Sequence, residues 1–294
     1  MLSACRVCPC RCGVDRHVGL GRCATPATAL VASWAPHFGE EPPLSGQQGS
    51  GTIFLANCNL RCVFCQNHDI SQAPKDFIGA SQSHQTLAAI MLELQRAGCH
   101  NINWVSPTHQ VPQLVRALAI AARNGLSLPV VYNTNAYDSL EVLRLLDGIA
   151  DIYLPDLKYA DEREARRLSR VPDYPAVARA ALSEMYRQIG PAWEEEEDGI
   201  LRRGILVRLL ILPGGLAGIE DSIRWLAEEL SPDVAVSLMS QYRPAHFAAR
   251  PGRFPDLDRR ITATDHARAI EALARFNRSQ HTYVQPHFGA ALGL

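Results

Sequence analysis

Hydrophobic and polar positions follow two alternating periods along most of this chain. Short apolar runs, typical of buried strands, are followed by longer stretches in which apolar residues recur every three to four positions, as on one face of a helix. The predicted strands are 51–56, 101–105, 128–133, 151–156, 205–212 and 234–241. The predicted helices are 85–98, 111–125, 139–148, 162–170, 174–190, 219–230 and 264–277.

Six strand–helix alternations indicate parallel strands joined by crossover helices. An open doubly wound sheet and a partial (β/α) barrel both fit this pattern. In either architecture the reactive groups lie at the carboxyl ends of the strands. The polar motifs of this chain occur there, one after each strand: the cysteine loop CNLRCVFC, then SPTHQ, NTN, DLK, PGG and QYRP. The positions of the motifs therefore support a functional site at this edge of the sheet.

Three regions are expected along the chain. Residues 1–35 form a cysteine-rich segment, 36–245 the strand–helix region, and 246–294 a helical tail. Residues 159–203 lengthen the connection between the fourth and fifth strands and are interpreted as an insertion. Its acidic run, 194–198, is predicted to be a solvated loop. The end of the tail, TYVQPHFGAALGL, carries no strong structural signal.

Composition narrows the classes of partner and compartment. Hydrophobic residues make up 47% of the 294 positions, enough for a sizeable core, and the formal net charge is −1. A chain with so little net charge has no electrostatic footprint for nucleic acid, so none is expected as partner. No apolar run approaches the roughly 20 residues that span a bilayer, so no membrane association is expected. The start, MLSACRVCPCRCG, lacks the apolar core of a secretory signal, and we expect a cytoplasmic protein.

Cysteine usage points to metal chemistry. Eight of the nine cysteines lie within the first 65 residues, a clustering that in a reducing compartment indicates metal ligands. Cys58, Cys62 and Cys65 have the spacing C-x3-C-x2-C, with no fourth cysteine beside them. A closed zinc or iron–sulfur site uses four protein ligands. Three thiolates instead leave one iron of a [4Fe-4S] cluster open to a small molecule. Cys99 stands apart and is predicted to be a small buried hydrophobe.

The cysteine loop, with Phe64 before its last cysteine, resembles the signature loop of the radical S-adenosylmethionine (SAM) superfamily. The chain also resembles the branch related to pyruvate formate-lyase activating enzyme, over most of its length from about residue 35 to 245. The shared motifs, as they stand here, are GSGTIFLANCNLRCVFCQNHDIS, NTNAY, DIYLPDLKYAD, SEMYRQIG, VRLLILPGG and MSQYRP. This resemblance implies an α/β fold: a partial (β/α)6 barrel with parallel strands, preceded by a small cysteine-rich metal-binding segment.

The resemblance also implies an activity. A [4Fe-4S] cluster on Cys58, Cys62 and Cys65 would bind SAM and cleave it reductively to a 5′-deoxyadenosyl radical that abstracts hydrogen from a substrate. The electron would come from a reductant such as flavodoxin or ferredoxin. The substrate is either a partner enzyme that receives a glycyl radical, or a small molecule or peptide. A rival hypothesis, a non-catalytic iron–sulfur or zinc redox sensor or scaffold, does not require residues that bind SAM.

Further cofactor-binding residues follow from the same resemblance. Asp156 is expected at the ribose, Lys158 at the methionine carboxylate, and Arg208 on the fifth strand at the cofactor. The other candidates are Phe64, Ser106, Asn133 and Gln241. Two positions depart from the pattern of the relatives. Ser106-Pro107-Thr108-His109 replaces their Gly-Gly-Glu stretch, and Asn133 replaces an aspartate that helps to bind a monovalent cation.

Weaker predictions concern the surroundings of the cofactors. His109 faces either the cofactor or the substrate, or is a hydrogen-bonded structural group. Gln241, Tyr242 and Arg243 are candidates for lining the substrate cavity. Gln66, Asn67 and His68 are candidates for ordering the cluster loop.

A second cysteine group occupies the start of the chain. In the relatives a four-cysteine pattern matches Cys5, Cys8, Cys12 and Cys23, with an arginine where this chain has Cys10. Four thiolates form a closed site, either structural zinc or a second [4Fe-4S] cluster. Cys10 is an additional candidate ligand. Because residues 1–35 are too few to build a core, a metal is expected to organise them.

Overall fold

The computed structural model describes residues 1–72 and 80–287, so the last seven residues of the predicted tail lie outside the described residues. The strands are β1 Ala29–His37, β2 Ser50–Leu55, β3 Ala80–Gln82, β4 Ile102–Val105, β5 Val130–Thr134, β6 Ile152–Pro155, β7 Glu194–Glu195, β8 Leu201–Leu210, β9 Ala235–Met239 and β10 Thr282–Val284. The helices are α1 Pro42–Ser45, α2 His68–Ser71, α3 His84–Arg96, α4 Val111–Arg123, α5 Leu140–Arg144, α6 Glu162–Ser169, α7 Tyr174–Ile189, α8 Ile219–Trp225 and α9 Ala263–Phe276. A 3-10 turn, η1, covers Pro213–Gly215, and a π-helical turn, η2 Leu226–Leu230, continues α8.

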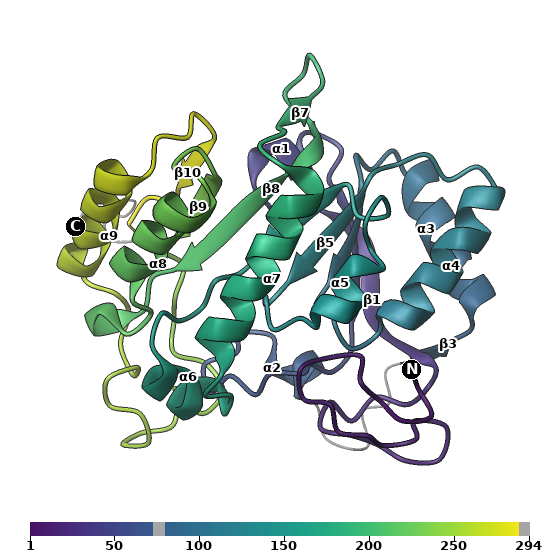
Figure 1. Cartoon of the computed structure of the whole chain (residues 1–294), viewed down its shortest axis with the longest axis horizontal. Helices are drawn as coiled ribbons and strands as arrows, with labels where there is room; N and C mark the ends of the chain where they lie inside the picture. The colour runs from purple at the N-terminus through teal and green to yellow at the C-terminus, as the bar shows by residue number, and fades with distance from the viewer. Residues whose placement is uncertain (73–79, 288–294) are drawn as a thin grey trace.

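One sheet organises the molecule, with the strand order β10-β9-β8-β6-β5-β4-β2-β1-β3. Strands β2, β4, β5, β6, β8 and β9 are the six predicted from the sequence, and each pairs in parallel with its neighbour. Helices α3, α4, α5, α7, α8 and α9 cover the outer face of this sheet (Figure 1). This is the predicted partial (β/α)6 barrel with parallel strands.

Four strands were not predicted from the sequence. β1 pairs antiparallel with β2 and with β3, and β10 pairs in parallel with β9, so both edges of the barrel are extended. β7 lies in the acidic run that was expected to be only a loop. Its glutamates are exposed and pair antiparallel with β8, so the solvent exposure was predicted and the hairpin was not.

The helices begin and end where local sequence favours it. The Thr262 side chain accepts from the backbone of Asp265 while Asp265 accepts from that of Thr262, which is a capping box at the start of α9. Helix α7 has Pro175 in its first turn and stops at Gly190, where φ is 68°. Residues 159–203 contain α6 and α7. Because α7 packs against β8, this stretch supplies the crossover between β6 and β8.

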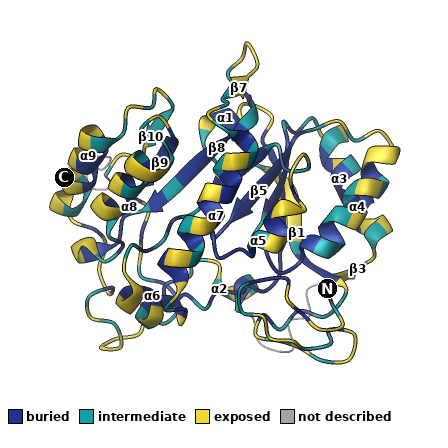
Figure 2. Ribbon diagram, viewed as in Figure 1, coloured by how far each residue is buried: buried dark blue, intermediate teal, exposed yellow. Residues whose placement is uncertain are grey.

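Successive side chains of each strand point to opposite faces of the sheet: one face packs in the core beneath the helices, and the other lines a more polar barrel interior. In β4, Ile102 and Trp104 belong to the main core beneath the helices, and the intervening Asn103 lies on the opposite face. In the same way Tyr132 and Val207 belong to that core, whereas the next residues in their strands, Asn133 and Arg208, do not. Figure 2 shows the central strands of the sheet buried and the outer sides of the helices exposed.

Helix α1 closes one mouth of the barrel. Its Leu44 is fully buried in a second, smaller core with Val131, Ile152, Leu154, Leu201, Leu206 and Ala235 from four strands. Figure 1 places α1 at one end of the sheet and α2, which follows the cysteine loop, at the other. The barrel interior therefore has a floor at α1 and an open edge at the cysteine loop.

No helix among residues 1–72 and 80–287 has the length and apolar character needed to cross a bilayer.

Candidate active site

The three-cysteine loop follows β2 at the carboxyl edge of the sheet. Its first turn depends on Asn57, a buried residue in the left-handed region with φ 67°, whose side chain donates to the Ala24 carbonyl at 3.0 Å. The loop is also hydrogen-bonded from both sides: the Val63 amide donates to Leu168 at 2.8 Å, and its carbonyl accepts from Ala248 at 2.9 Å. These bonds fix the backbone that carries the three thiols.

Each of the three thiols has one side-chain hydrogen-bond partner from another part of the chain. Asn135 Nδ2 donates to Cys58 Sγ at 3.3 Å, and Ser169 Oγ donates to Cys62 Sγ at 3.0 Å. The Cys65 Sγ and Ser71 Oγ atoms lie 3.1 Å apart. Such bonds orient metal-ligating thiols and adjust the electronic properties of a cluster. None of these partners was predicted from the sequence, since they come from the turn after β5, from α6 and from α2.

Burial and the neighbouring positive charge of Lys158 shift the pKa values of the thiols in opposite directions. Burial, aided by the charge of Cys62, raises the pKa of Cys58 to about 12. Burial also raises the pKa of Cys62, while the positive charge of Lys158 favours its thiolate. A bound metal deprotonates thiols outright, so this environment suits cysteines that become thiolates only on metal binding.

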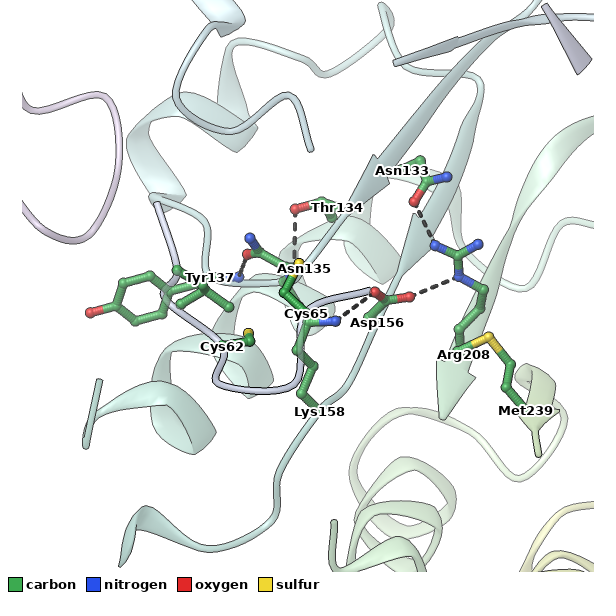
Figure 3. Close-up of polar contacts among 12 residues, drawn as sticks. Cys62, Cys65, Asn133, Thr134, Asn135, Tyr137, Asp156, Lys158, Arg208 and Met239 are labelled. Carbon is green, nitrogen blue, oxygen red and sulfur yellow. Dashed lines mark hydrogen bonds and ion pairs between the residues drawn. The ribbon is translucent and has the colours of Figure 1, made fainter. Parts of the chain in front are cut away.

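A chain of charged side chains crosses the interior beside the loop (Figure 3). Lys158 Nζ lies 2.7 Å from Asp156 Oδ2, and Arg208 Nε donates to Asp156 Oδ1 at 2.8 Å. The other two nitrogens of Arg208 donate to Glu40 Oε2 at 2.9 Å and to Asn133 Oδ1 at 2.6 Å. The register of the parallel strands places Asp156 opposite Arg208 and Asn133 opposite Leu154, so Asn133 lies two residues before their level on the same face of the sheet.

The ionisation states follow from these pairs. Burial alone would raise the pKa of Asp156, but the charges of Arg208 and Lys158 outweigh it and lower that pKa. For Lys158 the direction is reversed: burial alone would lower its pKa, but the negative charge of Asp156 outweighs burial and raises it. Burial raises the pKa of the Glu40 carboxyl despite its pairing with Arg208. Asp156, Lys158 and Arg208 are therefore charged at neutral pH, in a form that suits a zwitterionic ligand.

These groups line one cavity of about 860 Å³, within the range of ligand sites. The cavity extends from the cysteine loop to the floor at α1 and is bounded on one side by β10. Of the predicted cofactor-binding and cluster-ligating residues, its walls contain Cys58, Cys62, Phe64, Cys65, Ser106, Asn133, Asp156, Lys158, Arg208 and Gln241. The structure thus brings together side chains spread over more than 180 positions of sequence.

Ser106 keeps a glycine-type backbone without a glycine. It lies directly after β4 with φ 57°, and its amide donates to the Asn133 carbonyl at 2.9 Å. The left-handed region is one that glycine adopts freely and other residues adopt at a cost. At this departure from the glycine-rich pattern, Ser106 therefore adopts a backbone conformation that glycine would take without strain.

Asn133 has two defined partners in place of a cation. Its Oδ1 accepts from Arg208, and its Nδ2 donates to Glu40 Oε1 at 3.3 Å. An amide can both accept from an arginine and donate to a carboxylate, whereas an aspartate here would lose the second bond. The hydrogen bond to Glu40 explains why an asparagine suits position 133.

Several predicted neighbours lie elsewhere. His109 is fully buried outside the cavity walls, with Nε2 3.1 Å from the Ala56 carbonyl, and burial lowers its pKa to about 4. This environment makes it a neutral structural histidine. Tyr242, which donates to the Leu257 carbonyl at 2.7 Å, and Arg243 are likewise outside the walls, so the prediction that they line the cavity is wrong.

The three residues predicted to order the cluster loop lie beside it. Gln66 and Asn67 line the cavity, and Gln66 Nε2 donates to the Gln241 carbonyl at 3.3 Å. His68 Nδ1 lies 3.2 Å from the Cys65 carbonyl, and its ring stacks on His246 with centroids 4.7 Å apart.

Glu40 is the main residue that sequence reasoning missed. It lies in the turn between β1 and α1, 168 positions before Arg208, and its side chain is only 8% exposed. Asn103 and Asn133 both donate to its Oε1. The only signal in the sequence was a Glu-Glu pair before Pro-Pro, which nothing in the pattern connects with the interior of the barrel.

The cysteine-rich segment packs directly against the cluster loop and contains no helix or strand in residues 1–28. Cys10 Sγ lies 3.9 Å from the Asn59 carbonyl, next to Cys58. Cys5, Cys8 and Cys23 are buried and Cys10 is half-buried, whereas Cys12 is exposed and packs against Gly21. Arg16 ties the segment to the barrel, since its guanidinium donates to the Thr25, Pro26 and His109 carbonyls.

Neither cysteine group brings three metal-binding side chains, within the described ranges, to a point that would hold a single ion. The second site on Cys5, Cys8, Cys12 and Cys23, with zinc or a second [4Fe-4S] cluster, stays a prediction. A [4Fe-4S] cluster binds each thiolate to a different iron, so its ligands stand further apart. Cys58, Cys62 and Cys65, on one wall of the cavity, fit that ligand set.

Comparison with known proteins agrees with the site. Residues 52–190, which carry the cysteine loop and Asp156-Leu157-Lys158, match the model of the Radical SAM superfamily. The chain is also 29% identical over 281 residues to the uncharacterized protein MJ0674 of Methanocaldococcus jannaschii, covering 93% of this chain and 75% of that protein. The matched region, the barrel and the three-cysteine loop together support membership of this chain in the radical SAM superfamily.

Proposed function

We propose that this chain abstracts a hydrogen atom from a substrate bound in the 860 Å³ cavity. Membership of the superfamily makes it an iron–sulfur enzyme with a [4Fe-4S] cluster and SAM as cofactors. When bound, these supply the chemistry: one electron from an external reductant such as flavodoxin or ferredoxin cleaves SAM to methionine and a 5′-deoxyadenosyl radical. That radical takes a hydrogen atom and becomes 5′-deoxyadenosine, leaving the unpaired electron on the substrate.

The observation that carries this proposal is the shared wall of the cavity. The same cavity contains the three cysteines and the Lys158–Asp156–Arg208 chain. In our proposal the Lys158 ammonium holds the methionine carboxylate and the ionised Asp156 accepts from the ribose hydroxyls. Arg208 positions Asp156 and holds it ionised. A sensor or scaffold would not need this constellation, so the structure favours the enzyme over the redox-sensor hypothesis.

Aromatic side chains shield the loop from water. Phe64 is 6% exposed and packs edge-on against Tyr159 and Tyr242, with centroids 6.4 and 5.9 Å away. Tyr174 is fully buried; its hydroxyl donates to the Asp156 carbonyl at 2.7 Å and accepts from the Lys158 amide at 3.0 Å. Excluding water from such a site prevents quenching of a reactive intermediate and strengthens its electrostatic interactions.

Cleavage of SAM is the direct test. After anaerobic reconstitution with iron and sulfide, dithionite and SAM should yield 5′-deoxyadenosine and methionine in the wild-type protein. Replacing Cys58, Cys62 or Cys65 by alanine should abolish both products. Cys99→Ala is the matched control, because Cys99 is buried at 3% exposure and lies outside the cavity walls. A fully reconstituted wild type that forms neither product would refute the proposal.

The closed floor favours a small molecule over a partner enzyme as substrate. With α1 and Leu44 filling the far mouth, the described residues close that end of the cavity, and the enclosed space suits a compact substrate group. Incubation with a deuterated small-molecule extract should therefore place deuterium in 5′-deoxyadenosine. If only the protein fraction transfers deuterium, and a glycine-centred radical doublet appears, the chain instead activates a glycyl-radical enzyme.

A further inference from the structure

The part of the molecule around the cysteine loop is rich in arginine. Four segments form it: residues 1–28, 57–72, 161–173 and 241–260. Together they carry 14 arginines against eight aspartates and glutamates, whereas the whole chain has a formal net charge of −1. The rest of the chain therefore has a net negative charge, and the positive excess is concentrated around the loop that carries Cys58, Cys62 and Cys65.

Hydrogen bonds and an ion pair join these segments. The Val63 amide donates to the Leu168 carbonyl of α6, and the Val63 carbonyl accepts from the Ala248 amide. Arg167 Nη2 lies 2.6 Å from Asp256 Oδ2, which ties α6 directly to the segment that contains Ala248. Figure 1 places the N-terminal segment, α2 and α6 along the same edge of the molecule. The arginine-rich segments thus form one continuous region around the loop.

Three arginines lie where the N-terminal segment, the cysteine loop and the end of α6 meet. Arg61 Nη2 donates to the Arg22 carbonyl at 2.7 Å, and Arg22 Nη2 donates to the Arg170 carbonyl at 3.0 Å. Arg22 and Arg170 are exposed and Arg61 is half-buried. Asp173, three residues after Arg170, accepts from the Tyr137 hydroxyl at 2.9 Å. Among the described residues, none of the three arginines forms an ion pair, so their charges face solvent without a carboxylate partner.

Two further arginines share one aromatic ring beside the loop. The guanidinium carbons of Arg250 and Arg253 lie 4.7 and 4.2 Å from the centroid of the Phe247 ring. Both arginines are exposed, and neither is ion-paired to a carboxylate in the described part of the chain. Cation–π contacts hold these two like charges next to each other. Because Phe247 directly precedes Ala248, which is bonded to the loop, this pair flanks the cysteines.

The surroundings of these arginines favour a protein partner over nucleic acid. Val18 and Leu20, in the same segment as Arg22, are 88% and 59% exposed. Exposed apolar side chains combined with arginine are typical of protein interfaces. Nucleic-acid surfaces instead present free aromatic rings for stacking on bases, whereas the Phe247 ring is already covered by two guanidinium groups. The position next to the cluster ligands suits a partner that delivers electrons.

We propose that this arginine-rich surface docks a small acidic electron carrier, a protein with a flavin or iron–sulfur centre, which reduces the cluster. The inference rests on the proposed function, since that function requires an external one-electron reductant. One electron passes from the reduced carrier to the oxidised cluster, and no bond forms or breaks in this step. Charge complementarity speeds the encounter and orients the carrier towards the cysteine loop.

The reconstituted enzyme with SAM, mixed anaerobically with reduced flavodoxin or ferredoxin, tests the assignment. Stopped-flow absorbance follows oxidation of the carrier, and calorimetry measures its binding. The second-order rate constant should fall about tenfold or more as salt rises from about 0.02 to 0.5 M, because salt screens charge-steered association. At low salt, the double variant Arg250→Glu with Arg253→Glu, and separately Arg170→Glu, should lower the rate constant and the affinity about tenfold.

Two controls separate docking from damage to the cluster. Photoreduced deazaflavin is a small reductant that needs no docking surface, so with it all variants should form 5′-deoxyadenosine at the wild-type rate. Arg268→Glu is the matched surface variant, since Arg268 is exposed on α9, outside the arginine-rich segments. It should leave the rate constant and the affinity for the carrier unchanged.

The outcomes are distinguishable. A wild-type rate and affinity that do not depend on salt, unchanged values in the variants, or no binding of either carrier would overturn the assignment. If the variants also fail with deazaflavin, the salt dependence of the wild type decides. Oligonucleotide binding that the same variants abolish, with unchanged carrier rates, would reassign the surface to nucleic acid. A negative docking result with normal 5′-deoxyadenosine formation from deazaflavin refutes the docking alone. Absence of 5′-deoxyadenosine in the wild type refutes the proposed function, and carrier binding then still decides the docking.

Discussion

Single residues near the cysteine loop act mainly through the partners they give to the thiols. Ser169 is fully buried on α6, with its Oγ 3.0 Å from Cys62 Sγ and 2.6 Å from the Tyr159 hydroxyl. A donor to a ligating sulfur stabilises the more negative, reduced form of a cluster and so raises its reduction potential. The loop is therefore expected to influence how easily the cluster accepts an electron, independently of substrate.

Ser169→Ala should lower the reduction potential of the reconstituted cluster. Loss of one hydrogen bond to a charged sulfur is expected to shift it by about 50 mV, corresponding to roughly 1 kcal/mol for one electron. An anaerobic redox titration followed by electron paramagnetic resonance measures the shift. Ser183→Ala is the matched control, since Ser183 is exposed on α7 and bonds only the Arg179 carbonyl. An unchanged potential in Ser169→Ala would mean that the hydroxyl donates to Tyr159 instead.

At the scale of elements, the parallel strands are regularly paired, but the residues directly after several of them have unusual backbone φ angles. Non-glycine residues take positive φ after three of the parallel strands: Asn57 after β2, Ser106 after β4 and Ala136 after β5. Such conformations cost of order 1–3 kcal/mol each and persist where surrounding structure enforces them. Here these residues turn the chain at the sheet edge that lines the cavity, so the strained backbone lies at the functional site.

Ser106→Gly should stabilise the ligand-free protein. Glycine removes a left-handed penalty of roughly 1–2 kcal/mol but loses about 0.4–1 kcal/mol through the greater freedom of the unfolded chain, which leaves a gain of about 0.5–1 kcal/mol. Ser139→Gly is the contrasting control, because Ser139 has φ −81° and should lose stability. Chemical denaturation compares the two variants. Destabilisation by both would show that the Ser106 side chain contributes more than its backbone costs.

The six parallel strands and their helices were predictable from the sequence because each strand is a strong apolar run followed by a periodic helix. The edge strands were not: β10 has three residues, and β1 is exposed from Trp34 to Pro36. The sequence also did not show which side chains of a strand face the barrel interior. In β8, Arg208 interrupts an apolar run, and the pattern does not indicate on which face of the sheet it lies. The hydrogen bond from Arg208 to Asn133, across the intervening strand β6, shows that both side chains lie on the polar interior face.

At the scale of the molecule, the site depends on contacts between distant segments. The cysteine spacing and the Asp156-Leu157-Lys158 motif gave the chemistry of the site, since both are local patterns. Glu40 and Ser169 reach the same cavity or loop through tertiary packing alone, which no local pattern encodes. The cysteine-rich segment is a further example, because its irregular backbone is attached to the barrel by bonds between distant residues, among them Arg16 to His109, Asn57 to Ala24 and Gln113 to Ala27.

Arg16→Met should loosen this attachment while leaving the barrel folded. The Arg16 side chain is 2% exposed, and its donors reach the Thr25 and Pro26 carbonyls of its own segment and the His109 carbonyl of the barrel, the last at 2.7 Å. Hydrogen bonds from a charged group contribute about 1.5–3 kcal/mol each, so losing them should cost more than 3 kcal/mol of local stability. Limited proteolysis should then cleave within residues 1–28 well before the strands. Arg11→Met, at an exposed position of the same segment, should be cleaved like the wild type. Equal cleavage rates in the two variants would show that Arg16 is not needed to hold the segment and that its other bonds to the barrel, such as those of Ala24 and Ala27, are sufficient.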